Sequence, residues 1–124
     1  MAEPIESTVT LPTTPVMAGV ARVHVALILA DTPRLDDALV IASELATSAI
    51  RFGGADDFTI TVAVHGQRAR ITVSDTGRRR WIDRGSVDPF GYGIGLVALL
   101  ADEFGHDRID GTSAAWAEIT WRTS

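Results

Sequence analysis

The chain has 124 residues, a mass of 13.2 kDa, a formal net charge of −5 and a sequence pI of about 5.0. At roughly 150 residues per domain, this length leaves room for one hydrophobic core, which excludes a multidomain enzyme. With 46% hydrophobic and 22% charged residues, the composition is that of a globular protein and excludes disorder throughout. The acidic balance argues against direct binding of nucleic acid.

The chain contains no cysteine, which excludes disulfides, thiolate metal sites and a cysteine nucleophile. Its histidines, His24, His65 and His106, are too far apart in sequence to show the spacing of zinc ligands. The first ten residues are acidic where a signal peptide would be basic. The longest apolar run, 16–30, is shorter than the ~20 residues of a membrane span. We therefore expect a cytoplasmic protein that contacts no membrane.

The N-terminal half of the chain shows helical periodicity. Residues 1–7 are expected to form a flexible tail, and residues 7–11 fit an edge strand. Apolar residues spaced by three and four then predict a first helix over 16–30 and a second helix from about 34 to 50, which Gly53-Gly54 ends. The first helix carries its apolar residues at Val16, Val20, Val23, Leu27 and Ala30, and the second at Leu35, Leu39, Ala42, Ala46 and Ala49.

Two runs of alternating apolar and polar residues follow. They cover residues 58–64 and 69–74, and a turn at 65–68 separates them. This pattern predicts a β-hairpin with one buried face.

The remainder of the chain predicts a loop, a helix and two extended segments. Residues 76–90 show no periodicity, as in a long functional loop. A third helix is expected from about 94 to 104, a short extended piece at 106–109, and a last strand at 114–122. Because helices and strands occur in blocks, we expect an α+β two-layer sandwich. About three helices would pack on one face of a four- to five-stranded, mainly antiparallel sheet, within a single domain over 8–124.

The end of the second predicted helix brings together a carboxylate, a hydroxyl and a guanidinium. Glu44, Ser48 and Arg51 are spaced by four and three, which places them on one helix face. Such a column can serve a phosphate-bearing ligand. It can also be a solvated face on which Glu44 contacts Ser48, and the spacing leaves both interpretations open.

Two further segments have features of a nucleotide site. An aspartate at the end of a strand, Asp75, can accept a hydrogen bond from an exocyclic amine, and Gly77 lets a ligand approach the backbone; a plain turn is the alternative. The segment GYGIGL, residues 91–96, runs into the third predicted helix, whose free N–H groups favour phosphate. It follows a loop and not a strand, which excludes a Rossmann fingerprint.

In order and spacing, these three elements resemble the GHKL ATP-binding fold (Bergerat fold) of histidine kinases, Hsp90 and type II topoisomerases. More closely, they resemble the single-domain anti-sigma-factor serine kinases of bacteria. SELATSAIRFG (43–53) is similar to the N box of that branch, and VSDTG (73–77) to its adenine-binding box. GYGIGLVALLADEFG (91–105) is similar to its glycine-rich phosphate box, and AAWAEI (114–119) to its closing strand. The resemblance covers about residues 8–122.

The resemblance implies a role for each matching residue. Glu44 would be the catalytic general base that deprotonates the attacking hydroxyl, Asp75 would bind the adenine amino group, and Gly77 would line the adenine pocket. Residues 78–90 would form the ATP lid. The glycines that wrap the phosphates would be Gly91, Gly93 and Gly95, and Ile94 and Leu96 of the same segment would also bind the nucleotide.

Two positions depart from the family pattern. The N box has an Asn that supplies an oxygen to Mg²⁺, and here Ser48 stands in its place; a Ser hydroxyl can ligate Mg²⁺ but reaches less far, by about one bond. A Thr that helps to hold the adenine is replaced by Ala114, and Thr112 is the hydroxyl residue on the same strand face. Ser48 is therefore the candidate Mg²⁺ ligand and Thr112 a candidate nucleotide contact.

The resemblance implies a regulatory protein that binds ATP or ADP with Mg²⁺ and forms a homodimer. It would bind a sigma factor or a related regulator and phosphorylate a Ser of an antagonist protein. Both departures weaken phosphoryl transfer more than nucleotide binding, because transfer depends on positioning and on the metal. Enzymatic activity therefore stays open, and the alternative is a non-catalytic protein-interaction module of the same fold with weak or no nucleotide binding.

Overall fold

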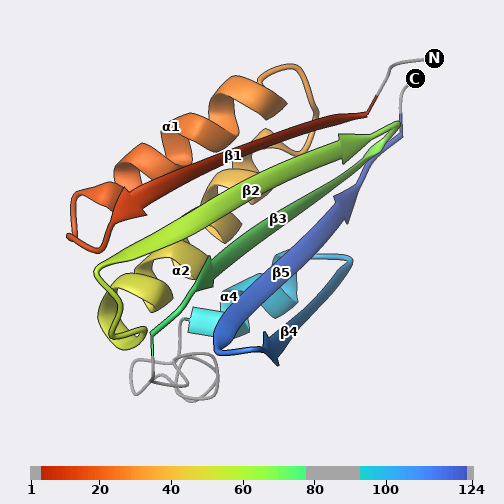
Figure 1. The fold of residues 1–124 in the computed structure, drawn as a ribbon. Coiled ribbons are helices and arrows are strands. Elements are labelled where there is room, and N and C mark those ends of the chain that lie inside the picture. The colour runs from red at the N-terminus through yellow and green to blue at the C-terminus, as the bar shows by residue number, and fades with distance from the viewer. Residues whose placement is uncertain (1–3, 78–92, 123–124) are drawn as a thin grey trace.

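Strands with alternating apolar and polar side chains form one antiparallel sheet in the computed structural model (Figure 1), which describes residues 4–77 and 93–122. The strands are β1 (Ile5–Pro12), β2 (Asp57–His65), β3 (Arg68–Asp75), β4 (Glu103–Ile109) and β5 (Thr112–Thr120). Their order in the sheet is β1-β2-β3-β5-β4, so that β1 and β4 are the two edges.

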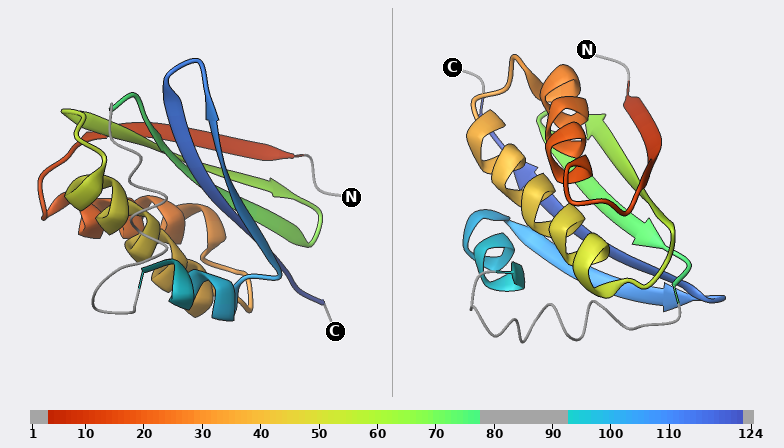
Figure 2. Two further views of the ribbon diagram at one scale, coloured as in Figure 1. Left: turned by 90° about the horizontal axis from the view of Figure 1, so that it is seen from below. Right: turned by 90° about the vertical axis from the view of Figure 1, so that its left-hand side faces the viewer.

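Helices cover one face of this sheet and leave the other face open (Figure 2). In the described residues they are α1 (Met17–Leu29), α2 (Leu35–Phe52) and α4 (Gly93–Leu100). Helix α2 packs against both α1 and α4 and against the central strands. The α+β two-layer sandwich is thereby confirmed. None of these helices has the length and hydropathy needed to cross a membrane.

The core lies between the helices and the sheet. Every second residue of β2, β3 and β5 faces the helices, as the period of a strand requires. The large, fully buried side chains are Leu29, Ile41, Leu45, Phe58, Ile60, Val62, Ile71, Val73, Val97 and Ile119, with Val25.

Helix α1 is apolar on two opposite faces. Its buried residues are Ala18, Ala21, Val25 and Leu29. The residues from which the helix was predicted are exposed instead: Val16 (68%), Val20 (39%), Val23 (58%) and Leu27 (76%). Both series repeat at spacings of three and four, so the periodicity indicated a helix without distinguishing its core face from its outer face. We call the exposed series the α1 stripe.

Some boundaries differ from the expected ones. Strand β1 begins at Ile5, within the range expected to be a flexible tail, because Ile5 pairs with Val64 of β2. Helix α4 ends at Leu100 and not near residue 104, because the Asp102 N–H donates to the carbonyl of Glu118, 2.9 Å away, and the chain continues as β4. The short extended piece expected at 106–109 is therefore part of a seven-residue edge strand.

Candidate functional site

Two of the predicted site residues lie in the second half of α2. Ser48 is only 5% exposed, and Glu44, one turn earlier on the same face, is half-buried. Arg51 is exposed, and its guanidinium lies 5.2 Å from the centre of the Phe52 ring. A buried hydroxyl beside a half-buried carboxylate excludes a fully solvated face for Glu44 and Ser48, whereas Arg51 does face solvent.

The C-terminus of α2 packs directly against the end of β3. Gly53 caps the helix with an N–H bond to the Ala49 carbonyl, 2.9 Å away, and Gly54 adopts a left-handed φ of 79°, which ends the helix. A Cβ on Gly53 would overlap Asp75 Oδ2, and a Cβ on Gly77 would overlap the Gly53 carbonyl. Both glycines therefore allow a close approach that any side chain would prevent.

Asp75 lies in the corner that these two glycines form. The residue is 5% exposed, and its Oδ1 accepts a hydrogen bond of 2.9 Å from the Gly77 N–H. Such an Asx turn sets the orientation of the side chain. We call the residues Gly53, Asp75 and Gly77 the Asp75 corner.

The sheet register brings Ser113, and not Thr112, to the Asp75 corner. Asp75 stands opposite Ser113, which is 1% exposed. Thr112 does share its face with Ala114, as expected, but this is the open face of the sheet and points away from the helices. Thr112 and Asp75 therefore lie on opposite faces of the sheet, since neighbouring residues in a strand point to opposite faces.

Arg108 of β4 also reaches the Asp75 corner. Its guanidinium donates to the Ser113 hydroxyl and, at 3.3 and 3.4 Å, to the Gly77 carbonyl. Neither Arg108 nor Ser113 was singled out from the sequence. The sequence could have indicated Ser113 only through strand alternation combined with the strand register, and the register is known only from the tertiary structure.

Helix α4 carries residues 93–96 of the glycine-rich segment alongside α2. Arg34 Nη2 donates to the Leu100 carbonyl, 2.6 Å away, which joins the end of α4 to the start of α2. Helix α4 packs along α2, and its C-terminal end lies at the start of α2. Its first turn, with Gly93 and Gly95, therefore lies toward the second half of α2 (Figure 2). A Cβ on Gly95 would meet no atom within 4 Å, so this turn has an open surface.

Several predicted residues can be placed only in part. Gly91 and the expected lid over residues 78–90 lie outside the described residues. Ile94 belongs to α4, but its side chain is outside the described part of the structure. Leu96 follows in the same helix and is half-buried.

One guanidinium, that of Arg34, fastens α4, α2 and β5 together. It reaches Asp37 at 2.9 Å, Asp102 at 3.1 Å and the Thr120 carbonyl at 2.9 Å, besides the end of α4. Asp102 in turn accepts bonds from the N–H (2.6 Å) and the hydroxyl (3.0 Å) of Thr120. The Thr120 N–H is the main cause that lowers the pKa of Asp102, and Arg34 adds to it.

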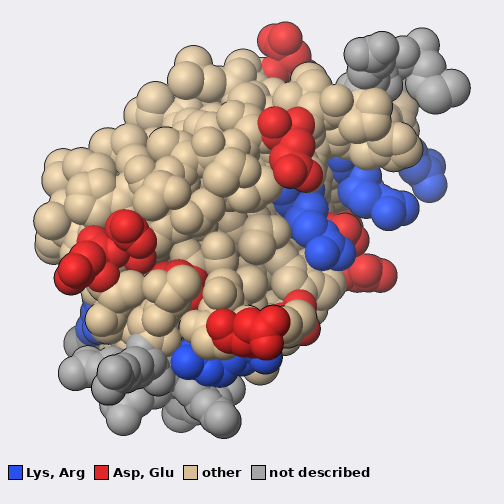
Figure 3. All heavy atoms as spheres, in the orientation of Figure 1, with Lys and Arg blue, Asp and Glu red and all other residues tan. Residues whose placement is uncertain are grey.

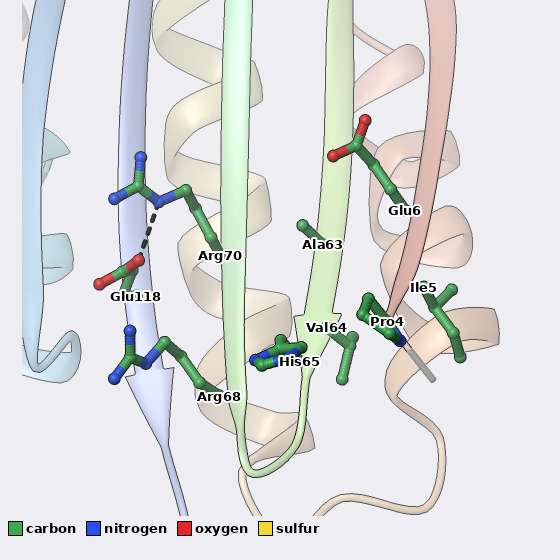
Figure 4. A pocket seen from close by; sticks show the side chains of 9 residues that line it. All are labelled: Pro4, Ile5, Glu6, Ala63, Val64, His65, Arg68, Arg70 and Glu118. Carbon is green, nitrogen blue, oxygen red and sulfur yellow. Dashed lines mark hydrogen bonds and ion pairs between the residues drawn. The ribbon is translucent and has the colours of Figure 1, made fainter. Parts of the chain in front are cut away.

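The open face of the sheet carries a hollow of about 350 Å³ near the start of β3 (Figure 4). Arg70 projects beside it, bound to Glu118 at 2.9 Å and lying 4.1 Å from the ring centre of Trp116. Figure 3 shows this face with its charged side chains. Arg68 and Asp75 are the two ends of β3, roughly 23 Å apart at the rise of a strand, so this hollow is separate from the Asp75 corner.

Whether Mg²⁺ can bind at α2 depends on the ligand atoms that the surrounding side chains provide. Among residues 4–77 and 93–122, no three His, Asp or Glu side chains gather closely enough to hold a metal. Mg²⁺ is commonly held by one or two protein oxygens together with the phosphates of a substrate. The described residues therefore offer no metal site made by protein carboxylates and histidines alone.

Comparison with known proteins supports the fold. No family model matches the chain, and no curated protein matches its sequence. Among solved structures, the crystal structure of the RsbU and RsbW domains of Rv1364c from Mycobacterium tuberculosis is similar, with a TM-score of 0.71 and 21% identity over 96% of this chain. This chain spans 32% of that longer one. At such identity the likeness establishes a common fold.

Proposed function

We propose that this protein is an ATP-binding regulator of the anti-sigma serine-kinase type. The observation that carries the proposal is the buried Asp75 carboxylate, oriented by the Gly77 N–H in a corner of close-packed backbone. A buried carboxylate acceptor in such a corner suits the exocyclic amine of adenine. The fold that the chain shares with a protein containing an RsbW domain supports the same assignment.

In this proposal the phosphates extend from the Asp75 corner toward the first turn of α4. Helix N-termini present free N–H groups and a positive dipole end, which favour anions. Gly93 and Gly95 at this turn carry no side chain that would keep phosphates away from the backbone. Ser48 would be the protein ligand of the accompanying Mg²⁺, whose chemistry is to neutralise charge on the phosphoryl group.

The proposed reaction is phosphoryl transfer to a Ser of a protein antagonist. Glu44 takes the proton of the Ser hydroxyl, whose oxygen forms a bond to the γ-phosphorus. The bond between that phosphorus and the β–γ bridging oxygen breaks, and ADP leaves. A half-buried Glu44 on a rigid helix is suited to the role of base, because positioning contributes most of such catalysis.

The partners in this proposal are proteins: a sigma factor or related regulator, and the antagonist that is phosphorylated. The active species is a homodimer. Binding of a sigma factor and phosphorylation of its antagonist would let the protein switch between the two partners.

A non-catalytic interaction module of the same fold is the second candidate. Ser48 favours it, because a hydroxyl in place of an amide shortens the reach toward a metal that requires distances near ~2.1 Å. Such a protein would keep its partners and lose phosphoryl transfer.

Calorimetric titration of the folded protein with ATP and with ADP, each with and without Mg²⁺, tests the proposal. Binding that strengthens with Mg²⁺ supports a working site and leads to a search for the phosphorylated partner. Binding without any effect of Mg²⁺ favours a nucleotide-binding module that does not transfer phosphate. Absence of binding under all four conditions contradicts the nucleotide site and favours the interaction module.

A further inference from the structure

The Ser113 hydroxyl is a buried hydrogen-bond donor whose proton has no acceptor among residues 4–77 and 93–122. Ser113 is 1% exposed, and within these residues its side chain is bonded by Arg108. A guanidinium carries N–H donors and no acceptor, so the hydroxyl oxygen must accept this bond. The hydroxyl proton is then left for another partner. Because a buried donor without an acceptor is costly, this group points to an acceptor that a bound ligand brings.

Arg108 can fix this polarity without belonging to the core. The residue is exposed on the edge strand β4, opposite Ser113 in the register, and its guanidinium reaches inward to the Asp75 corner. It also donates to the Gly77 carbonyl at 3.3 and 3.4 Å. Two acceptors on different elements hold the planar guanidinium in place. The Ser113 oxygen therefore stays occupied, and its proton is directed away from Arg108.

The Ser113 donor and the Asp75 carboxylate are neighbours. The two residues are a cross-strand pair of β5 and β3, and both are buried on the side that faces the helices. The Cβ atoms of such a pair lie about 4.5–5.5 Å apart. The Asp75 carboxylate is oriented by the Gly77 N–H. The Asp75 corner thus presents an acceptor and, beside it, a donor of fixed polarity.

This pair of groups distinguishes the two purines. The Watson–Crick edge of adenine carries an amino donor beside a ring nitrogen, N1, that accepts, which complements an acceptor beside a donor. Guanine carries an oxygen in place of that amino group, and its N1 bears a proton. Guanine would therefore set acceptor against Asp75 and donor against Ser113. A hydroxyl that is free to rotate could accept from guanine N1 and relieve the second mismatch.

We propose that Arg108 is a positioning residue that makes the site selective for adenine over guanine nucleotides, because it holds the Ser113 hydroxyl as a donor toward N1 of the base. The inference rests on the proposed nucleotide site and adds a residue of β4 to it. Arg108 acts on the base only through Ser113. Since sites built to hydrogen-bond a ligand reject mismatched analogues strongly, we expect the wild-type protein to prefer ATP over GTP by about 100-fold or more.

The nucleotide selectivity of arginine variants tests this role. Displacement calorimetry with ATP and GTP gives the ratio of their dissociation constants. Arg108→Met, with an apolar side chain, should lower the preference for ATP about tenfold, mainly by improving GTP binding. Arg108→Lys can still donate to Ser113 and should keep most of the preference. Arg68→Met is the control, because Arg68 lies at the far end of β3 and no described residue bonds its side chain.

A double-variant cycle tests whether Arg108 acts through Ser113. Ser113→Ala should lower the preference for ATP by about the same factor as Arg108→Met. Once the hydroxyl is absent, Arg108→Met should change the preference by less than about twofold, whereas independent contributions would multiply. Arg108 is exposed and Ser113→Ala removes a single oxygen, so we expect all variants to fold, which circular dichroism checks.

Two analogues of ATP test the contact with the base. In 1-deaza-ATP a C–H group replaces N1, and in 7-deaza-ATP a C–H group replaces N7. The wild-type protein should bind 1-deaza-ATP about tenfold more weakly than ATP and should bind 7-deaza-ATP as well as ATP. Ser113→Ala should bind ATP and 1-deaza-ATP equally, because the donor that reads N1 is gone.

The outcomes separate this inference from the proposed function. If the wild-type protein binds ATP and Arg108→Met leaves the ATP preference unchanged, the role of Arg108 is overturned and the nucleotide site stands. The same holds if Arg108→Met has its full effect without the Ser113 hydroxyl. It also holds if 1-deaza-ATP binds the wild type as well as ATP, since the hydroxyl then donates within the protein. A folded wild-type protein that binds neither nucleotide overturns both proposals.

Discussion

Gly77 packs so closely on Gly53 that a methyl group on Gly77 would overlap the Gly53 carbonyl oxygen. This contact joins the end of β3 to the end of α2, two segments that are far apart in sequence. It also buries the Asp75 carboxylate between them. The contact thus determines both the geometry of the candidate site and part of the stability of the fold.

Replacing Gly77 by Ala should therefore destabilise the protein. The new Cβ meets backbone atoms of residues 53 and 55, which cannot move as a flexible side chain would. We expect a loss of about 1–3 kcal/mol in the free energy of unfolding, measured by urea denaturation. Gly95→Ala is the control, because its Cβ meets nothing and the residue is helical; we expect a change between zero and a gain of about 1 kcal/mol. Equal effects of the two substitutions would contradict the close packing at Gly77.

Asp75→Asn should weaken ATP binding while the protein stays folded. The Asn oxygen can still accept from the Gly77 N–H, so the turn is kept, but the charge that strengthens a hydrogen bond to adenine is lost. We expect a reduction in affinity of about 10- to 100-fold by calorimetry. Asp107→Asn, at an exposed position of β4, is the control. An affinity that Asp75→Asn leaves unchanged would place the adenine elsewhere.

Ser48→Asn should raise the Mg²⁺-dependent part of ATP binding and any phosphoryl transfer. The amide oxygen extends about one bond further than the Ser hydroxyl, toward the distance that Mg²⁺ requires. Ser48 is buried, so the thermal stability of the variant has to be measured first. Ser48→Ala, which removes the oxygen, should have the opposite effect on Mg²⁺ dependence. If a folded Ser48→Asn protein gains nothing, Ser48 is not the reason for a weak metal site.

The contribution of Asp102 to stability should disappear in acid. The Thr120 N–H and Arg34 lower the pKa of Asp102 in the folded protein, so its carboxylate stabilises the fold above the ordinary pKa of an aspartate. That contribution is lost as the pH falls through the lowered pKa. The difference in urea midpoint between the wild type and Asp102→Asn should thus be present at pH 7 and shrink below about pH 4. Asp57→Asn, at an exposed position, serves as the control; a difference independent of pH would exclude an electrostatic origin.

Local pattern was enough to predict most elements of the fold. Strict alternation in 58–64 and 69–74 predicted the hairpin of β2 and β3, and the double glycine at 53–54 predicted the end of α2. The predicted third helix ends four residues beyond the end of α4. The segment LLADEF continues a helical pattern, but the Asp102 N–H donates to a carbonyl of β5. Bonds of this kind join distant segments and leave no trace in local periodicity.

The residues of the candidate site likewise fall into those that the sequence predicted and those that only the structure shows. The strand end at Asp75 and the helix column of Glu44 and Ser48 were identified by residue type and spacing. The partner on β5 was not, since Thr112 and Ser113 are adjacent and only the register decides which of them faces Asp75. Arg108 lies 31 residues from Gly77 in the chain, and its contact follows from the pairing of β4 with β5.

The sequence by itself therefore determined the periods of the helices and strands, the turn residues and the chemical types available at the site, because these depend on neighbours within a few residues. The tertiary structure alone decided which apolar side of α1 is buried, which hydroxyl of β5 stands opposite Asp75, and that Arg34 joins α4 to α2 and β5. Each of these depends on the packing of segments that are distant in the chain. An amphipathic or alternating pattern does not specify which segment its apolar face packs against; the sheet register and the helix layer decide this.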